Sequence, residues 1–432
     1  MSGGFIFAIG ALVFLSAIGV PIAFAMLIGS VGYLFITGQD VGLVAEQALN
    51  GLFDSFVLLA VPLFIVAANF MNAGTVSDRL LSFCLAVVGR FRGGLAQVDV
   101  IANVIFSGMS GSAIADAAGI GRIIIDMMRK DGRYPAGYAA ALTAAASVIG
   151  PIIPPSIPMV LYALVSDTSV GYLFLGGILP GLLIAAVLMV LNVWTARRRN
   201  FPRDEAVPLR DLPRVTVKAF PALMLPVILL AGIYGGATTP TEAASIAAAY
   251  ALALAVLLYR SLSWRGFFDL VLDAARSTSV VGLIIAAALV FNYLVASENI
   301  PDLVATNLTA LHLSPEGFFI ATNIVFLILG CLLDATTLLL IVVPIFLPTA
   351  KALGIDLVYF GVVIVVNIMI GLVTPPYGVL LFVINGITGI PLRDIIREIW
   401  PFIAVLIAAL LVMVFFPEIV LWLPQQFGYR GS

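Results

Sequence analysis

The sequence predicts an all-α polytopic membrane protein made of two inverted repeats, each with a re-entrant helical hairpin and a proline-broken helix. Of its 432 residues, 62% are hydrophobic and 10% are charged, and the mean hydropathy is +1.16. A helix needs about 20 apolar residues to cross roughly 30 Å of hydrocarbon. Uncharged runs of this size lie at 3–37, 55–77, 168–196, 277–297 and 399–417. Because these runs are continuous rather than alternating, they exclude a membrane β-barrel.

Two further uncharged stretches are interrupted by prolines near their centres. Residues 134–166 contain Gly-Pro-Ile-Ile-Pro-Pro-Ser at 150–156, and residues 357–392 contain Gly-Leu-Val-Thr-Pro-Pro-Tyr-Gly at 371–378. A break inside the membrane frees backbone groups, which is tolerated only where protein or a polar cavity receives them. Two breaks in corresponding positions indicate a secondary transporter and the place where its ions bind.

The two halves of the chain are expected to be repeats. The polar segment 197–216 carries several arginines, which places it in the cytoplasm as a linker between repeats at 1–196 and 217–432. Three landmarks recur 221 to 223 residues apart, and the broken helices are expected at 134–166 and 357–386. The landmark pairs are Pro154-Pro155 with Pro375-Pro376, Gly108 with Gly330, and Asn69 with Asn292.

Each half also contains a predicted helical hairpin, at 93–128 and at 317–350. The tip of the first is Ser107–Ser112, and the tip of the second is Gly330–Thr337, where Asp334 is the only charge. Each arm has about 16 residues, or about 24 Å of helix, which favours a re-entrant hairpin over two complete spans. Two closely spaced full spans are the alternative.

The charges that follow the first tip are expected at the surface. Asp116 and Asp126 are predicted, with Arg122, Arg129 and Lys130, to lie where the hairpin returns to the cytoplasm. This leaves Asp334 as the only good candidate for a carboxylate inside the membrane.

A hairpin tip that meets a broken helix brings together carbonyls, hydroxyls and a carboxylate, which are hard donors suited to Na⁺. The predicted sodium ligands are Ser107, Gly108, Ser110, Ser112, Gly150 and Pro154 in the first half, and Gly330, Asp334, Gly371, Thr374 and Pro375 in the second. Half-helix N-termini at the breaks could hold an anionic substrate. The predicted substrate-lining residues are Asn69, Ser156, Asn292 and Thr337. The alternative is that the motifs are helix kinks lined with small residues, and that the asparagines only join helices.

Other features of the sequence have structural interpretations. Thr239-Pro240-Thr241-Glu242 predicts a capping box at the start of a helix. Cys84 and Cys331 are expected to be unpaired packing residues. With one histidine and no acidic cluster, the chain lacks the residues of a membrane enzyme. No cofactor other than Na⁺ as coupling ion is expected, and no nucleic acid.

Together these motifs resemble the large membrane subunit of tripartite ATP-independent periplasmic (TRAP) transporters, the DctM-like family. The match is strongest at 106–116 (Phe-Ser-Gly-Met-Ser-Gly-Ser-Ala-Ile-Ala-Asp), at 150–156, at 235–244 with its Thr-Pro-Thr-Glu-Ala core, and at 374–378. The resemblance implies an elevator-type, Na⁺-coupled importer of an organic acid in the bacterial cytoplasmic (inner) membrane.

The resemblance also implies partners for this chain. They are a periplasmic substrate-binding protein and a small four-helix TRAP membrane subunit that is a separate chain, besides the membrane lipid. The substrate is expected to be a C4-dicarboxylate, sialic acid or another sugar acid. The alternatives are a stand-alone Na⁺-coupled carboxylate symporter of related architecture and an antiporter that uses Asp334.

Overall fold

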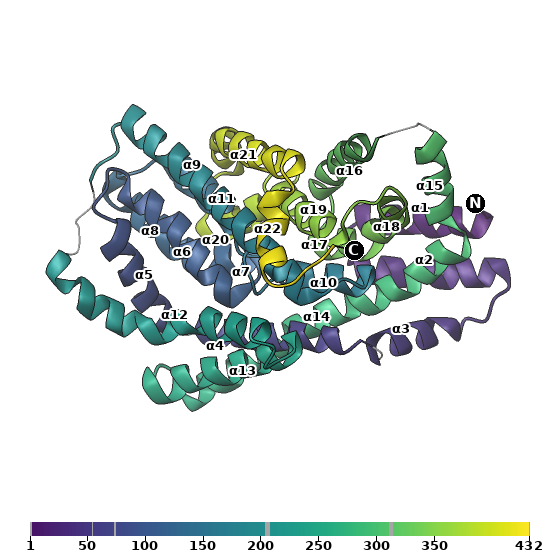
Figure 1. Ribbon diagram of the computed structural model, residues 1–432, viewed down its shortest axis with the longest axis horizontal. Helices are drawn as coiled ribbons and strands as arrows, with labels where there is room; N and C mark the ends of the chain where they lie inside the picture. Colours follow the sequence, from purple (N-terminus) through teal and green to yellow (C-terminus); the bar gives the residue numbers. More distant parts are fainter. Residues whose placement is uncertain (1, 54, 73–74, 204–207, 311–313, 432) are drawn as a thin grey trace.

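The computed structural model describes residues 2–53, 55–72, 75–203, 208–310 and 314–431, and over these ranges the chain forms helices and no β-strand (Figure 1). The helices up to the linker are α1 (Gly3–Ala17), α2 (Ile22–Thr37), α3 (Leu43–Phe53), α4 (Ala60–Met71), α5 (Thr75–Val88), α6 (Gly94–Ser110), α7 (Ala113–Asp116), α8 (Arg122–Arg129), α9 (Ala136–Ser147), α10 (Ile157–Ser166) and α11 (Val170–Arg198). The all-α class predicted from the sequence is confirmed.

The helices after the linker are α12 (Leu212–Tyr234), α13 (Pro240–Ala253), α14 (Trp264–Ser297), α15 (Ile300–Ala310), α16 (Pro315–Gly330), α17 (Ala335–Thr337), α18 (Val343–Ala352), α19 (Leu357–Gly371), α20 (Val379–Thr388), α21 (Leu392–Phe415) and α22 (Glu418–Gln426). Six of the described helical segments are long and apolar enough to cross a membrane. The shorter apolar helices include α6, α10, α16, α19 and α20, which belong to the predicted hairpins and broken helices.

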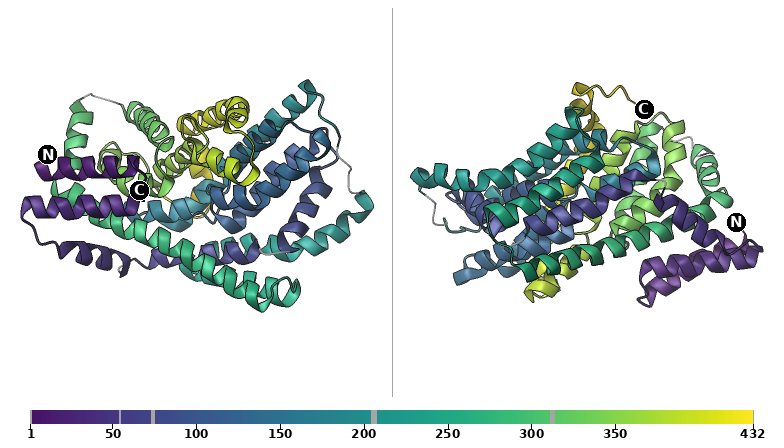
Figure 2. Two further views of the ribbon diagram at one scale, coloured as in Figure 1. Left: turned by 180° about the vertical axis from the view of Figure 1, so that it is seen from behind. Right: turned by 90° about the horizontal axis from the view of Figure 1, so that it is seen from below.

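An outer group of helices lies along one long side of the molecule. Figure 1 shows α3, α4, α12, α13 and α14 there, and Figure 2 shows α1 and α2 side by side at one end. Helix α13 packs on α4 through buried alanines, and α14 packs on α2, α3 and α4. Small side chains let two membrane helices approach closely. The predicted capping box begins α13: the Glu242 amide donates to the Thr239 hydroxyl (3.3 Å), and the Thr239 amide donates to the Glu242 carboxylate (2.8 Å).

The two predicted broken helices form the centre of the molecule. Every residue of α19 is buried, as is every residue of α9 from Gly137 onward. Helix α9 ends at Ser147 and the chain resumes as α10 at Ile157, while α19 ends at Gly371 and resumes as α20 at Val379. Both breaks contain a cis peptide bond, Pro154–Pro155 and Pro375–Pro376. The helix breaks therefore lie where the sequence places them; the first is largely buried, whereas Pro376 and Tyr377 of the second are exposed.

Both predicted hairpins are present as helix–turn–helix units. In the first, α6 is followed by the left-handed residue Gly111 (φ +60°), then by α7, the π-helical turn Ala117–Gly121, and α8. In the second, α16 is followed by α17, the π-helical turn Leu338–Val342 and α18. The second arm of each hairpin thus contains a π-helical turn. The two turns lie 221 residues apart in the sequence, as do the two cis prolines. The inverted relation of the two halves and the depth of the hairpins in the membrane stay predictions.

Candidate ion and substrate site

The first hairpin tip touches the first helix break through residues that lack a side chain. A Cβ atom placed on Gly111 would lie 2.6 Å from the Pro155 carbonyl oxygen. A Cβ atom on Gly150 would lie 2.2 Å from Oδ2 of Asp116. Both distances are shorter than real Cβ contacts. Glycine is required at position 111, where the obstructing atom is backbone, whereas at position 150 a larger residue would displace the end of the Asp116 side chain. We call this contact between tip and break the first junction.

The hydroxyl groups of the first junction are used in short-range hydrogen bonds. Ser110 donates to Oδ1 of Asp116, and its oxygen lies 3.4 Å from the Ser112 amide nitrogen, which donates to it. Ser112 caps α7 by accepting from the Ala115 amide (3.4 Å). Ser156 donates to the Pro151 carbonyl and caps α10 by accepting from the Met159 amide (3.2 Å). These contacts give the first junction its shape and leave the role of Ser156 toward a substrate as a prediction.

Two of the predicted ion ligands, Ser107 and Gly108, have their nearest contacts outside this junction. The Ser107 hydroxyl donates to the Val104 carbonyl in its own helix (2.6 Å). A Cβ on Gly108 would lie 2.4 Å from Cγ of Pro226 in α12, but 3.9 Å from the Pro154 carbonyl oxygen. Gly108 therefore permits close packing of the hairpin against α12. This agrees with the alternative interpretation, in which the small residues of the motif serve helix packing.

The second hairpin tip meets the second break in the same manner, and we call this contact the second junction. A Cβ on Gly371 would lie 2.6 to 2.9 Å from backbone atoms of Gly330, and the Gly378 amide donates to the Cys331 carbonyl (3.4 Å). Thr374 donates to the Ile370 carbonyl (2.8 Å), close to the cis bond before Pro376. The structure thus brings Gly330, Gly371 and the break together.

Asp334 and Thr337 form a closed pair at the second tip. The half-buried Asp334 caps α17 by accepting from the Thr337 amide (3.1 Å), and it also accepts a hydrogen bond from the Thr337 hydroxyl. Both carboxylate oxygens therefore have a donor from the same residue. This carboxylate is a helix cap in the structure.

The two predicted substrate-lining asparagines bind neighbouring helices. Asn69 donates to the Leu270 carbonyl of α14 (3.4 Å), away from either junction. Asn292 donates to the Leu340 carbonyl in the π-helical turn of the second hairpin (2.8 Å), and its own Oδ1 is buried without a partner. Of the two, Asn292 has the hydrogen bond to a hairpin, and Asn69 has the helix-joining hydrogen bond of the alternative interpretation.

Each hairpin is joined to its broken helix by a buried polar contact that the sequence did not predict. Asp99 of α6 is fully buried and accepts from Asn103 (3.1 Å) and from Thr143 of α9 (2.6 Å). In the second half, Asn367 of α19 donates to the side-chain oxygen of Asn323 in α16 (2.8 Å). The spacing of Asp99 and Asn103, four residues apart in an apolar helix, is the signal that could have indicated such a contact.

The prediction that Asp116 lies at the cytoplasmic surface is wrong. Asp116 is 1% exposed and lies beside the first tip, whereas Asp126 is exposed. With Asp99 also buried, Asp334 is not the only candidate for a carboxylate inside the membrane. The short sequence distance from Asp116 to the arginines was misleading because the second arm of the hairpin is helical, which separates its two ends.

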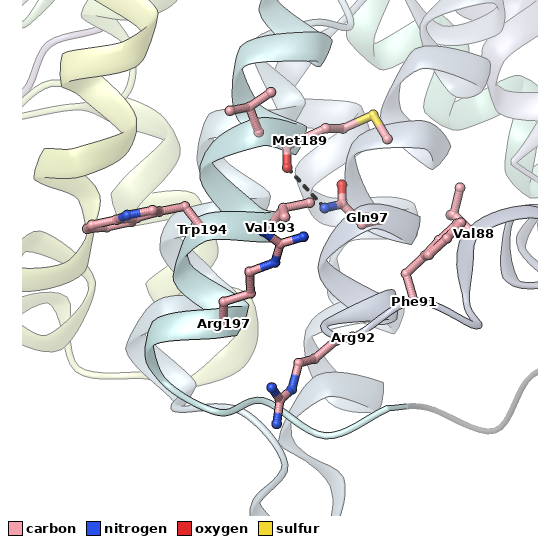
Figure 3. A pocket seen from close by; sticks show the side chains of 9 residues that line it. Val88, Phe91, Arg92, Gln97, Met189, Val193, Trp194 and Arg197 are labelled. Atoms are coloured by element: carbon pink, nitrogen blue, oxygen red, sulfur yellow. Dashed lines mark hydrogen bonds between the residues drawn. The ribbon is translucent and has the colours of Figure 1, made fainter.

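A groove of about 580 Å³ lies between α6 and α11, and no residue of the two junctions lines it. Figure 3 shows Gln97 donating to the Met189 carbonyl (3.0 Å), with the guanidinium group of Arg197 near Val193, that of Arg92 farther from Gln97, and Trp194 pointing away from Gln97. None of the predicted ion or substrate residues lines this groove. The candidate site is therefore defined by the two junctions and not by this groove.

The fold is that of a helical membrane protein in which two hairpin tips meet two broken helices. Its architecture is similar to the crystal structure of the Alcanivorax borkumensis YdaH transporter, with a TM-score of 0.59 and 14% sequence identity over 86% of this chain and 87% of that one. This likeness concerns the fold alone.

The chain belongs to the family described as "Tripartite ATP-independent periplasmic transporter, DctM component", whose model matches residues 9–419. It is 37% identical to the sialic acid TRAP transporter large permease protein SiaM of Vibrio cholerae, over 95% of this chain and 96% of that protein. It is 39% identical to the 2,3-diketo-L-gulonate TRAP transporter large permease protein YiaN of Escherichia coli, over 94% and 95%. It is 40% identical to the C4-dicarboxylate TRAP transporter large permease protein DctM of Pseudomonas aeruginosa, over 87% and 88%.

These matches confirm the predicted family. The protein is a transporter subunit rather than an enzyme, and it lies in the bacterial cytoplasmic (inner) membrane, which its six long apolar helical segments can cross.

Proposed function

We propose that this chain is the large permease subunit of a TRAP transporter that imports an organic acid together with Na⁺. The observation that carries the proposal is the pair of junctions, where a glycine-containing hairpin tip touches a proline-broken helix in each half. Broken helices in corresponding positions form the ion and substrate sites of many secondary transporters. Each junction supplies oxygen donors, which suit Na⁺ better than a soft metal.

The substrate is proposed to be an organic acid whose carboxylate faces the N-termini of α10 and α20. Both half-helices begin at a break, so their first amide groups and the positive end of the helix dipole point toward that break. The three named relatives are permeases for sialic acid, 2,3-diketo-L-gulonate and C4-dicarboxylates, and each of these compounds bears a carboxylate. Such a substrate fits a site with helix N-termini.

The proposed mechanism is of the elevator type. The hairpins and broken helices would move together as a transport domain, because buried polar contacts join α6 to α9 and α16 to α19. The outer helices, with a separate small four-helix membrane subunit, would form the scaffold. A periplasmic binding protein would deliver the substrate to this complex.

The test is uptake into proteoliposomes that contain this chain and its small partner, under an inward Na⁺ gradient. Candidate acids are supplied with and without the binding protein. We expect uptake to require both Na⁺ and the binding protein. Uptake that needs Na⁺ alone would instead support the stand-alone symporter, and uptake without Na⁺ would contradict the ion coupling.

Variants of the second junction sharpen this test. Gly371→Leu and Asp334→Ala are expected to reduce Na⁺-dependent uptake strongly. Gly386→Ala in α20 is the control, since a Cβ there would have no atom within 4 Å. If Gly371→Leu and Asp334→Ala both transported like the unaltered protein, the second ion site would be wrongly placed.

A further inference from the structure

The groove of about 580 Å³ between α6 and α11, which we call the α6–α11 groove, combines an apolar wall with a basic end. Val190 and Val193 of α11 form part of the wall, and their side chains are 70% and 39% exposed. Arg92 and Arg197 line the same groove where α11 approaches the linker. A ligand that covers this groove must therefore have an apolar part and an anionic part.

Contact between two chain segments fixes the position of the basic end. Gly93 has a left-handed backbone (φ +71°), and a Cβ atom there would lie 2.7 Å from Cβ of Ala196. This close approach brings the next residues along the two segments, Arg92 and Arg197, to the same end of the groove. Nε of Arg92 also donates to the Phe201 carbonyl (3.1 Å), which holds this side chain against the linker.

The side chain of Arg197 is turned back along α11 into the groove. Figure 3 shows its guanidinium group near Val193, which lies four residues, or about 6 Å, earlier in the helix. Cationic side chains near the end of a membrane helix normally extend the other way, toward the interface and water. Neither Arg197 nor Arg92 forms a salt bridge within the described part of the chain. An anion at the mouth of the groove would therefore complement both guanidinium groups.

The charge distribution places this end of the groove at the level of the cytoplasmic lipid headgroups. Arginines gather here, at positions 90, 92, 197, 198, 199 and 203, and such clusters mark the cytoplasmic side of a membrane protein. Trp194 is 54% exposed and lies 5.0 Å from the guanidinium carbon of Arg198. Exposed tryptophans are typical of the membrane–water interface. The apolar wall then continues from this interface beside the acyl chains.

We propose that the α6–α11 groove binds an anionic phospholipid of the cytoplasmic leaflet. Its phosphate contacts Arg197 and Arg92, and one acyl chain lies along Val190 and Val193. The cytoplasmic leaflet contains anionic lipids, and basic pockets between membrane helices on this side hold their headgroups in other proteins. Inorganic phosphate would match the charge but would leave the apolar wall uncovered, which is why the structure favours a lipid.

The groove is already formed in the protein without a lipid. The carboxamide of Gln97, which is 3% exposed, joins α6 to α11 by donating to the Met189 carbonyl (3.0 Å). This hydrogen bond fixes the spacing of the two helices that line the groove. A preorganised site of this kind loses little binding free energy to rearrangement.

The experiment measures lipid binding to the purified complex of this chain and its small subunit by native mass spectrometry. Phosphatidylglycerol is the anionic probe, and phosphatidylcholine with the same acyl chains is the zwitterionic one. We expect phosphatidylglycerol to bind at a lower half-saturating concentration. The double variant Arg92→Gln with Arg197→Gln should raise this concentration about 25-fold, because each basic residue near an anionic lipid contributes a factor of about five.

Matched variants separate the basic end from general surface charge. Arg210→Gln with Arg214→Gln removes the same charge from exposed positions near the linker that do not line the groove, so phosphatidylglycerol binding should not change. Arg92→Lys with Arg197→Lys keeps the charge and should keep most of the affinity.

A second pair of variants tests the apolar wall. Val193→Trp obstructs the wall while both arginines remain, and we expect it to weaken phosphatidylglycerol binding. Val280→Trp, at a 60% exposed position of α14 outside the groove, should have no effect.

Four results would overturn the proposal. The first is equal affinity of the unaltered complex for the two lipids, and the second is an equal loss of affinity in the groove and linker arginine-to-glutamine variants. The third is normal phosphatidylglycerol binding by Val193→Trp, which would exclude an acyl chain in the groove. The fourth is no lipid binding by the unaltered complex, which would indicate that the small subunit covers the groove. Loss of folding in both the glutamine and the lysine variants at Arg92 and Arg197, measured by thermal unfolding, would make these arginines structural residues instead.

Discussion

Replacing Gly371 with alanine tests the contact that forms the second junction. The new Cβ would lie 2.6 Å from the carbonyl carbon of Gly330, about 0.8 Å closer than the 3.4 Å where ordinary contact begins. Since the obstructing atoms are backbone, the hairpin tip itself must move. Overpacking of this kind costs about 1–3 kcal/mol, and the better helix propensity of alanine returns about 1 kcal/mol. A net loss of up to about 2 kcal/mol remains, which corresponds to a factor of up to roughly 30 in an equilibrium.

If an intact junction is needed for the ion, this factor should appear in Na⁺ binding. We expect Gly371→Ala to raise the half-saturating Na⁺ concentration by up to roughly 30-fold in thermal-shift titrations of the purified complex. Gly386→Ala is the control, because it makes the same chemical change in α20 where a Cβ meets nothing within 4 Å. The reasoning would be refuted if the two variants had equal Na⁺ responses and equal unfolding temperatures.

Three other predictions concern contacts outside the junctions. Asn367→Leu should lower stability by about 1–3 kcal/mol, because it leaves the buried side-chain oxygen of Asn323 without its donor. The double variant with leucine at both positions should recover part of this loss in thermal unfolding. No recovery would argue against the pairing. Thr239→Ala should cost about 1 kcal/mol through loss of the helix cap, measured by thermal unfolding, whereas Thr239→Ser should stay close to the original stability. Hydrogen bonds from the Ser2 hydroxyl and then its amide hold the pKa of Glu298 below its usual 4.5. The stabilisation from these hydrogen bonds is therefore complete above pH 4.5 and is lost as the pH falls below 4.5. Amide exchange of the first helix should accelerate below this pH. The Glu298→Gln variant should show no such acceleration.

Much of the fold could be predicted from the sequence because membrane burial leaves a strong signal in composition. Uncharged stretches of about 20 residues and paired prolines indicated both the membrane helices and their two breaks. The breaks at 148–156 and 372–378 lie within the predicted segments. The π-helical turns at Ala117–Gly121 and Leu338–Val342 were not predicted, since they arise in apolar stretches without a distinctive residue.

The candidate site could be predicted only in part, because its contacts are between distant segments. Glycines at 150, 330 and 371 were singled out, and the structure places all three at a junction. Asp116 was assigned to the surface because Arg122 and Asp126 follow closely in the sequence. The segment from Asp116 to Asp126 is helical, however, and its ten steps span about 15 Å at 1.5 Å per residue. One end of this segment therefore lies at the tip while the other reaches the surface.

The attachments between each hairpin and its broken helix suggest why an ion would act at the tips. Away from the tip, α6 is held to α9 through Asp99, whose two oxygens are both paired, so this contact has no free group for a ligand. At the tip, the same hairpin meets the break through Asp116, whose Oδ2 is unpaired. A cation can therefore strengthen the tip contact without disturbing the contact further along the arm. Binding energy gained only in the closed junction shifts the hairpin toward that state, which is the thermodynamic requirement for coupling ion binding to movement.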